Sequence, residues 1–326
     1  ADAIVAHKQA LPSISDLNRP NARIVVTPDS PSEFLSRVLI ASFNLPLLPT
    51  DKWMIGEKGS PEVYASLRGE SGTRPYAYAL WEPDVSRALK DRSVHVLLDS
   101  SKLRGYIVDV LVARRSFLVD NYPVVRAVLE SYARTLYASR SNLQGVVLDD
   151  AKQLGYALGN ADADRLVQGI QWKNTLENYA HFGLSDSASG LETMAEIIVK
   201  ITDVLVKTGA LDRNPHTQGV NSLYFDRLLR EMKDGGFHPG RAVNVLSDVD
   251  LGTSDEDIRA PTRLGKLSEG QWDALVAVGE FRVEPITFGR GTSRLNMQSQ
   301  HDLAALAKLL NSFPHYYVTA TGRVKA

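Results

Sequence analysis

Short apolar runs alternate with segments of helical periodicity up to about residue 139, and this alternation constrains the fold more than any other feature. Arg23–Thr27 is rich in β-branched residues, as strands are, whereas the apolar residues of Phe34–Ala41 recur at the spacing of a helix. The other predicted strands are Asp2–Ala6, Tyr76–Trp81, Val94–Leu98 and Tyr106–Val112. Strands separated by helices predict an α/β fold with a mostly parallel sheet covered on both faces.

The pattern changes twice further along the chain. Helical periodicity dominates from about residue 141 to 234, and Ser247–Arg263 is a polar stretch typical of a linker. Beyond it, Phe281–Glu284 and Tyr316–Ala320 are predicted strands on either side of a helix, a partial α+β segment. We therefore expect a large domain over residues 1–246, a linker over 247–270 and the beginning of a second domain over 271–326. Because a strand opens the chain at once, we expect the first domain to lack its N-terminal part.

Composition excludes several classes of protein. The 37 basic and 38 acidic residues leave a formal net charge of -1, so no global basic field attracts nucleic acid. Cysteine is absent, which removes disulfides, thiolate metal sites and cysteine nucleophiles together. The phosphate-loop, zinc-protease and nucleophile-elbow signatures are also missing from the sequence. We expect a protein that is not an enzyme and has no catalytic residue, metal or cofactor.

The loop after the second predicted strand is the first candidate binding site. Thr27-Pro28-Asp29-Ser30-Pro31-Ser32 joins that strand to a helix, with Ser30 or Ser32 as its cap. In an open parallel sheet, ligands collect beyond the carboxyl ends of the strands, where a helix N-terminus offers amide donors. The alternative is that both serines only cap their own helix. Asp29 disfavours a strongly anionic ligand.

Two more strand ends are expected to converge on the same place. Trp81 and Glu82 follow the strand Tyr76–Trp81, so the indole could wall a pocket and the carboxylate could orient a cationic or hydroxylated ligand. Alternatively, Trp81 belongs to the core and Glu82 supplies favourable charge to the first turn of a helix. Ser100, Ser101 and Tyr106 are secondary candidates after the next strand.

At these motifs the chain resembles type 2 periplasmic substrate-binding proteins, in the family that binds nitrate, sulfonates and thiamine precursors. The resemblance covers Ala1 to about Tyr137, and the helical stretch to Met232 resembles the C-terminal helices of the family. The motifs that carry it are Ala3-Ile4-Val5-Ala6, Ser13-Ile14-Ser15-Asp16-Leu17, Ile24-Val25-Val26 with Asp29-Ser30, Leu80-Trp81-Glu82-Pro83, and Asp109-Val110-Leu111-Val112-Ala113-Arg114 with Phe117. Asp29 stands where the family usually has glycine before the capping serine.

The resemblance implies a function in solute transport. It implies periplasmic-binding-protein-like lobes that close around a small molecule, as the extracytoplasmic solute-binding component of an ABC-type transport system. The implied partner is the membrane component of the transporter or an envelope sensor, and the implied location is the periplasm or cell envelope. The first lobe of the family begins upstream of the residues present here.

The tail has a resemblance of its own. Phe281–Ala326 is similar to the start of an OmpA-like domain, through Val283-Glu284-Pro285-Ile286-Thr287-Phe288-Gly289-Arg290-Gly291-Thr292 and Tyr316-Tyr317-Val318-Thr319-Ala320. That family implies association with the cell wall, with peptidoglycan as a partner through the downstream part of the domain. The alternative function is a non-transport envelope interaction or scaffold protein whose ligand cleft is degenerate.

Overall fold

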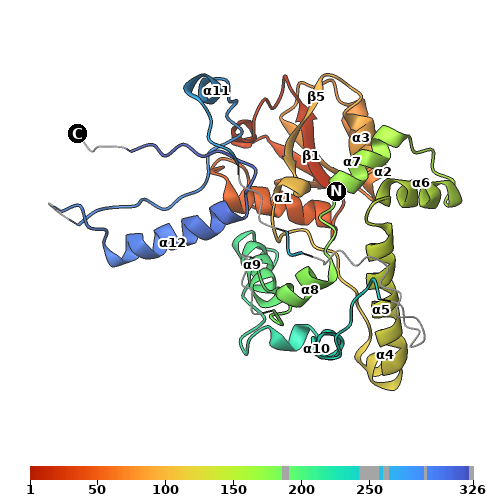
Figure 1. Cartoon of the computed structure of the whole chain (residues 1–326). Helices are drawn as coiled ribbons and strands as arrows, with labels where there is room; N and C mark the ends of the chain where they lie inside the picture. Colours follow the sequence, from red (N-terminus) through yellow and green to blue (C-terminus); the bar gives the residue numbers. More distant parts are fainter. Residues whose placement is uncertain (186–190, 242–256, 260–263, 290–291, 323–326) are drawn as a thin grey trace. The chain divides into compact units, whose positions relative to one another are not determined.

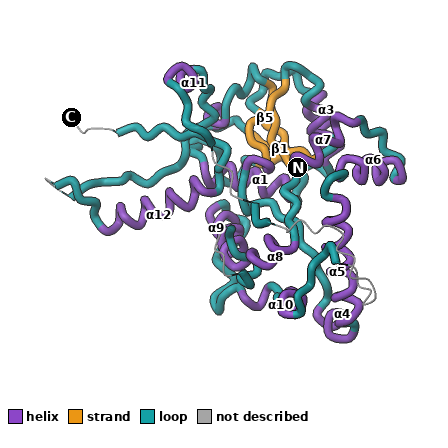
Figure 2. Tube along the Cα trace, in the orientation of Figure 1, coloured by secondary structure: helices purple, strands orange, loops and turns teal. Residues whose placement is uncertain are grey.

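The computed structural model describes residues 1–185, 191–241, 257–259, 264–289 and 292–322 (Figures 1 and 2). The chain forms two compact units. The first unit comprises Ala1–Ile107, Val204–Asp212 and Thr262–Ala326; the second comprises Val108–Asp203 and Arg213–Pro261. The tail therefore groups with the first 107 residues, a division that differs from the three consecutive parts expected from the sequence. Most of the expected linker, 247–256 and 260–263, lies outside the described residues.

A five-stranded sheet forms the centre of the first unit, in the order β3-β2-β4-β1-β5. Its strands are β1 (Asp2–His7), β2 (Arg23–Val26), β3 (Met54–Gly56), β4 (Tyr76–Trp81) and β5 (Val94–Asp99). β2 pairs in parallel with β3 and β4, whereas β1 pairs antiparallel with β4 and β5. Four strands thus run in one direction and β1 is reversed, which confirms the predicted α/β class with a mostly parallel sheet.

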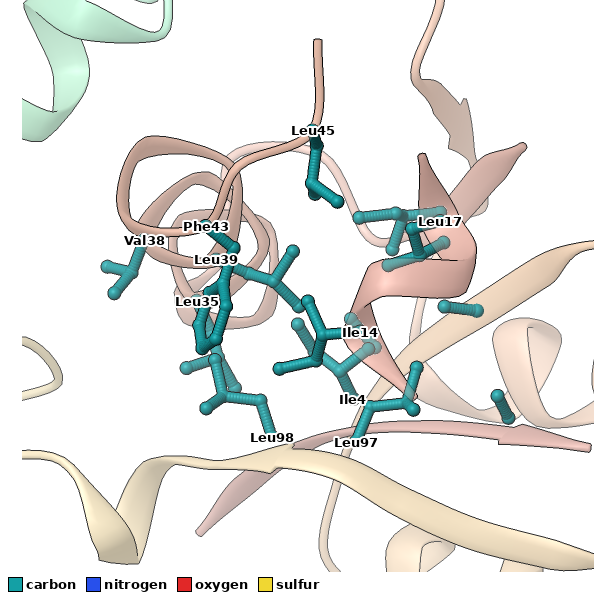
Figure 3. Packing of buried hydrophobic residues seen from close by; sticks show 14 of the residues in the cluster. Ile4, Ile14, Leu17, Leu35, Val38, Leu39, Phe43, Leu45, Leu97 and Leu98 are labelled. Carbon is teal, nitrogen blue, oxygen red and sulfur yellow. The ribbon is translucent and has the colours of Figure 1, made fainter. Parts of the chain in front are cut away.

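Side chains alternate between the two faces of the sheet, and each face packs into a separate core. On one face Ile4, Ile24 and Ala77 pack under helix α1 (Pro31–Ser42), and Figure 3 shows Leu35 and Leu39 of this helix close to the strand residues. On the other face, neighbouring strand residues such as Val25 and Tyr78 pack under α2 (Ser60–Gly69) and α3 (Asp84–Ala88). The period of two in the strands accounts for this division. The unit also contains the 3-10 helices η1 (Ile14–Leu17) and η2 (Ser100–Lys102), and the tail helices α11 (Glu269–Asp273) and α12 (Met297–Asn311).

Three predicted strands are not strands in the structure. Tyr106–Val112, Phe281–Glu284 and Tyr316–Ala320 are loops, apart from an isolated bridge between Phe281 and Phe43. A β-branched run favours extended backbone, but a strand also needs a neighbour to pair with. Val112 is 87% exposed and has no such neighbour among the described residues. The prediction of a strand was therefore wrong for each of these segments.

The second unit consists of helices joined by loops in its described residues. Its helices are α4 (Arg115–Asp120), α5 (Tyr122–Ser139), α6 (Leu143–Gln153), α7 (Asn160–Gln168), α8 (Thr175–His181), α9 (Met194–Lys207, whose last residues belong to the first unit), η3 (Asn221–Leu223) and α10 (Arg227–Asp234). A small core of Tyr179, Leu184, Leu229 and Met232 joins α8 to α10. No helix in the described parts of either unit is long and apolar enough to cross a membrane.

One buried carboxylate organises the start of α8. Glu177 is 1% exposed, and its two oxygens accept hydrogen bonds from the guanidinium of Arg259 at 3.1 and 2.8 Å. It also accepts from the amide of Asn174, whose own side chain caps the helix. Burial alone would raise the pKa of Glu177, but the bonds to Arg259 and Asn174 and the nearby positive charge together hold it below its ordinary value.

Shortening the buried face of α1 is expected to destabilise the first unit. Leu39 is fully buried under the helix, so Leu39→Ala should lower the free energy of unfolding by about 2–5 kcal/mol through lost burial and a residual cavity. The matched control is Leu47→Ala, since Leu47 is 58% exposed and should change stability by no more than about 0.5 kcal/mol. Denaturant unfolding measures both; equal losses would contradict this assignment of the core.

The Glu177–Arg259 pair predicts a pH dependence. Because the native pKa of Glu177 is lowered, the pair contributes stability above the unfolded pKa and loses it as the pH falls through the native pKa. Glu177→Gln should therefore destabilise the protein by about 1–2 kcal/mol near neutral pH, a figure discounted for the exposure of Arg259. The difference from wild type should shrink in acid. Denaturant titrations at several pH values measure it, and a difference independent of pH would refute the pair's contribution.

Candidate functional site

At the carboxyl ends of β2 and β4, the two following connections lead to opposite faces of the sheet. The two strands are parallel neighbours, with Val25 opposite Tyr78. The helix after β2, α1, packs on one face of the sheet, whereas the helix after β4, α3, packs on the other. The two connecting loops therefore leave the sheet in opposite directions. In open α/β sheets, such a switch point is where ligands bind.

The centre of this edge is Asp2, a residue that the sequence reasoning did not select. Because β1 is reversed, its first residue lies at the same edge as the last residue of β4, and Asp2 pairs with Trp81. The amide of Asp2 donates to Ser100 Oγ at 3.0 Å, and Ser32 Oγ donates to Asp2 Oδ1 at 2.7 Å. Asp2 thus connects three strand ends. An acidic residue opening an apolar strand was the only sequence signal.

Helix α1 is capped by its own residues. Ser30 Oγ accepts from the amide of Glu33 at 3.2 Å and donates to the carbonyl of Thr27 at 2.6 Å. Pro31, the first helical residue, has no amide hydrogen to offer. The buried Ser32 side chain is held by Asp2. The capping alternative therefore holds for Ser30, whereas the Ser32 side chain binds Asp2. The positive end of the helix dipole is thus already close to a carboxylate of the chain itself.

The loop before α1 is shaped by Asp29. This residue has a φ of 56°, in the left-handed region that aspartate tolerates better than most residues with a Cβ. Its amide donates to Glu33 Oε2 at 2.8 Å, while Glu33 Oε1 accepts from Arg37 Nε at 2.6 Å. The exposed side chain of Asp29 adds negative charge beside the helix N-terminus.

Trp81 and Glu82 lie where the sequence predicted, at the end of β4. Trp81 is half-buried, and its backbone N–H donates to Ser60 Oγ at the start of α2, at 3.4 Å. Glu82 Oε2 accepts from the amide of Ser86 at 3.0 Å, which makes it a cap for the first turn of α3. The half-buried indole lies at this edge, while one oxygen of Glu82 accepts a hydrogen bond from α3.

The end of β5 brings Ser100 and Ser101 to this edge, but not Tyr106. Ser100 Oγ accepts a hydrogen bond from the amide of Asp2, and the amide of Ser101 donates to Asp99 Oδ1 at 2.8 Å. Tyr106 is buried in the core on the α1 face of the sheet. Seven of the eight predicted residues therefore surround one edge, and Tyr106 does not: Asp29, Ser30, Ser32, Trp81, Glu82, Ser100 and Ser101.

Four of the charged residues at this edge are acidic, while Lys102 of η2 brings a positive charge to the same edge. Asp2, Asp29, Glu82 and Asp99 all belong to strand ends or the loops that follow them. Arg37 is already paired with Glu33, at 2.6 Å. The arrangement suits a neutral, hydroxylated or cationic small molecule better than an anion.

In the described segments, no group of three histidine or acidic side chains could hold a metal ion. Two shallow hollows lie on the second unit, one along Pro123–Ser131 of α5 and one around Leu148–Leu158. Neither includes a predicted site residue.

Comparison with protein-family models, with curated proteins and with solved structures finds no match for this chain.

Removing the Ser32 hydroxyl is expected to destabilise the edge. Ser32→Ala removes the buried hydroxyl that donates to the Asp2 carboxylate, and this should cost about 1–3 kcal/mol in the free energy of unfolding. In a double-mutant cycle with Asp2→Ala, the double variant should lose less stability than the sum of the losses of the two single variants, since either change breaks the same bond. Denaturant unfolding measures the cycle, with Ser101→Ala as the control. Strict additivity would show that Asp2 and Ser32 are not coupled.

Proposed function

We propose that this chain is a non-catalytic solute-binding protein, which holds a small neutral or cationic molecule at the carboxyl edge of β2 and β4. The observation that carries the proposal is the switch point itself: adjacent parallel strands whose following helices pack on opposite faces. An indole, hydroxyls and carboxylates surround it. This mixture suits recognition of a small polar molecule by a few positioned groups.

Each group at the edge has a distinct role in the proposal. Trp81 is the apolar wall against which the solute packs, and it would favour a cation or a sugar-like face through its π-system. Glu82 and Asp99 accept hydrogen bonds from the solute with the carboxylate oxygen that each does not use in the chain. Asp2 and Ser32 act as a rigid base beneath them.

The cellular setting of the proposal comes from the resemblance alone. A type 2 periplasmic binding protein serves an ABC-type transporter or an envelope sensor, and an OmpA-like tail associates with the cell wall. On that basis we place the chain in the periplasm or cell envelope, as the solute-binding component of a transport system, with peptidoglycan as a partner through the tail.

The second candidate is an envelope interaction or scaffold protein whose cleft no longer binds a solute. The internal hydrogen bonds favour it: Ser30 caps α1, Ser32 is buried on Asp2, and Glu82 caps α3. A cleft whose polar groups satisfy one another has less to offer a ligand.

Thermal denaturation with small probes separates the two functions. We expect stabilisation by a cationic or hydroxylated probe, such as choline, an aminopyrimidine or a monosaccharide, and none by nitrate or taurine. A ligand at about 100 times its dissociation constant adds about 2.7 kcal/mol to the stability of the state that binds it. Trp81→Ala should abolish this stabilisation.

The matched control for that measurement is Trp272→Ala. Trp272 lies in the tail, where its ring packs against Tyr317 instead of a strand end. This variant should keep the stabilisation by the probe. If both tryptophan variants respond to the probe like wild type, binding does not take place at the proposed edge; if no probe stabilises the wild type, the interaction function gains support.

A further inference from the structure

The segment Val278–Arg282 runs beside the C-terminal end of α1 and hydrogen-bonds to it as a strand would. The amide of Asn44 donates to the carbonyl of Glu280, and the amide of Arg282 donates to the carbonyl of Ser42, both at 2.8 Å. Between these bonds, Phe43 and Phe281 form an antiparallel bridge. A third bond runs from the amide of Ile14 to the carbonyl of Val278, also at 2.8 Å. The main chain is thus held on two neighbouring elements.

Two side chains of this segment, Val278 and Phe281, are partly buried against the same core. Phe281 stacks on Phe43, with ring centroids 5.0 Å apart and planes at 23°. Phe313, which follows α12, packs edge-on against Phe281 at 5.0 Å and is 2% exposed. Aromatic pairs at these separations add to the stabilisation from burial. The tail therefore supplies part of the core of the first unit from two points in its sequence.

Gly279 shows how closely the segment approaches. A Cβ at this position would lie 2.8 Å from Phe43 Cδ1 and 3.1 Å from Ile14 Cβ. A side chain would therefore push the segment away from the end of α1. The surface around Phe43 and Ile14 therefore requires glycine at position 279, two residues before Phe281.

A second attachment holds the tail near η2. The amide of Arg104 donates to the carbonyl of Ser312 at 3.0 Å. Tyr316 packs against the core on the α1 face, where burial, and then the charge of Asp99, raise its pKa to about 12. Attachments at α1 and at η2 prevent the tail from pivoting about either one.

We propose that Val278–Arg282, together with Phe313, is an intramolecular clasp that fixes the tail to the first unit. The surface formed by Ile14, Ser42, Phe43 and Asn44 is a docking site for an extended peptide, and its occupant is the chain's own segment. Such main-chain pairing with one anchored aromatic residue is a recurrent way of binding extended peptides. The tail is consequently held rigidly against helix α1 and the sheet of its own unit, whichever solute or partner that unit binds.

A pair of introduced cysteines tests the clasp in the full chain, which has no cysteine of its own. The bridge between Phe43 and Phe281 places Asn44 opposite Glu280, and both side chains are exposed. Paired residues on antiparallel strands lie about 5.5 Å apart, within reach of a disulfide. We expect Asn44→Cys/Glu280→Cys to form an intramolecular disulfide under mild oxidation, read by non-reducing electrophoresis and peptide mapping.

The control pair is Asn44→Cys/Glu284→Cys, which moves the second cysteine four residues along the tail, roughly 13 Å of extended chain. It should not form the disulfide. Equal oxidation of both pairs would show a freely moving tail and overturn the clasp. A disulfide between two chains would assign the docking site to a second copy and would equally refute the intramolecular form.

Amide hydrogen exchange on the unmodified protein provides an independent readout. The amides of Ile14, Asn44 and Arg282 should exchange at least about tenfold more slowly than exposed tail amides. Phe281→Ala should remove this protection, while Phe288→Ala, which truncates an exposed phenylalanine of the same tail, should preserve it. Rapid exchange at all three amides in the wild type would contradict the clasp even if every variant folds poorly.

Discussion

The packing of helix α1 on the sheet is the interaction on which the rest of the first unit depends. Its apolar stripe buries Leu35, Val38 and Leu39 fully, and this burial fixes the helix on one face. Its N-terminal turn holds Asp2 through Ser32, and its C-terminal end receives Phe281. One rigid helix thereby sets the position of the strand-end edge and of the tail together.

Asp2 illustrates how a buried charge is accommodated at such an edge. At 9% exposure, the Asp2 carboxyl group needs hydrogen bonds to compensate for the water that it loses on burial. The Ser32 hydroxyl supplies a bond of 2.7 Å, and the first turn of α1 supplies the positive end of a dipole. The same interactions that stabilise Asp2 use up the helix terminus as a site for an external anion. In the proposed function, the charge of the solute is therefore limited by the same interactions that stabilise this edge.

Much of the sheet could be predicted from sequence because its strands carry their own signal. The β-branched run at Arg23–Thr27 and the apolar run at Tyr76–Trp81 are strands in the structure, with boundaries shifted by at most one residue. The reversal of β1 could not be predicted, since strand direction depends on partners distant in sequence. Asp2 was missed for that reason: only in a reversed strand does the first residue lie beside Trp81. The short β3 has too few residues for a periodic pattern.

The tail shows the opposite relation between local signal and structure. Phe281-Arg282-Val283-Glu284 alternates like a half-buried strand, yet only Phe281 finds a bridge partner and only its ring packs in the aromatic cluster. The alternating pattern correctly indicated strand-like backbone at Phe281, which bridges to Phe43. The amide of Arg282 donates to the carbonyl of Ser42 at the end of α1. What local sequence could not indicate was the partner, which lies more than two hundred residues upstream. A segment whose local pattern predicts a strand can thus complete a core formed mostly by residues far upstream in the same unit.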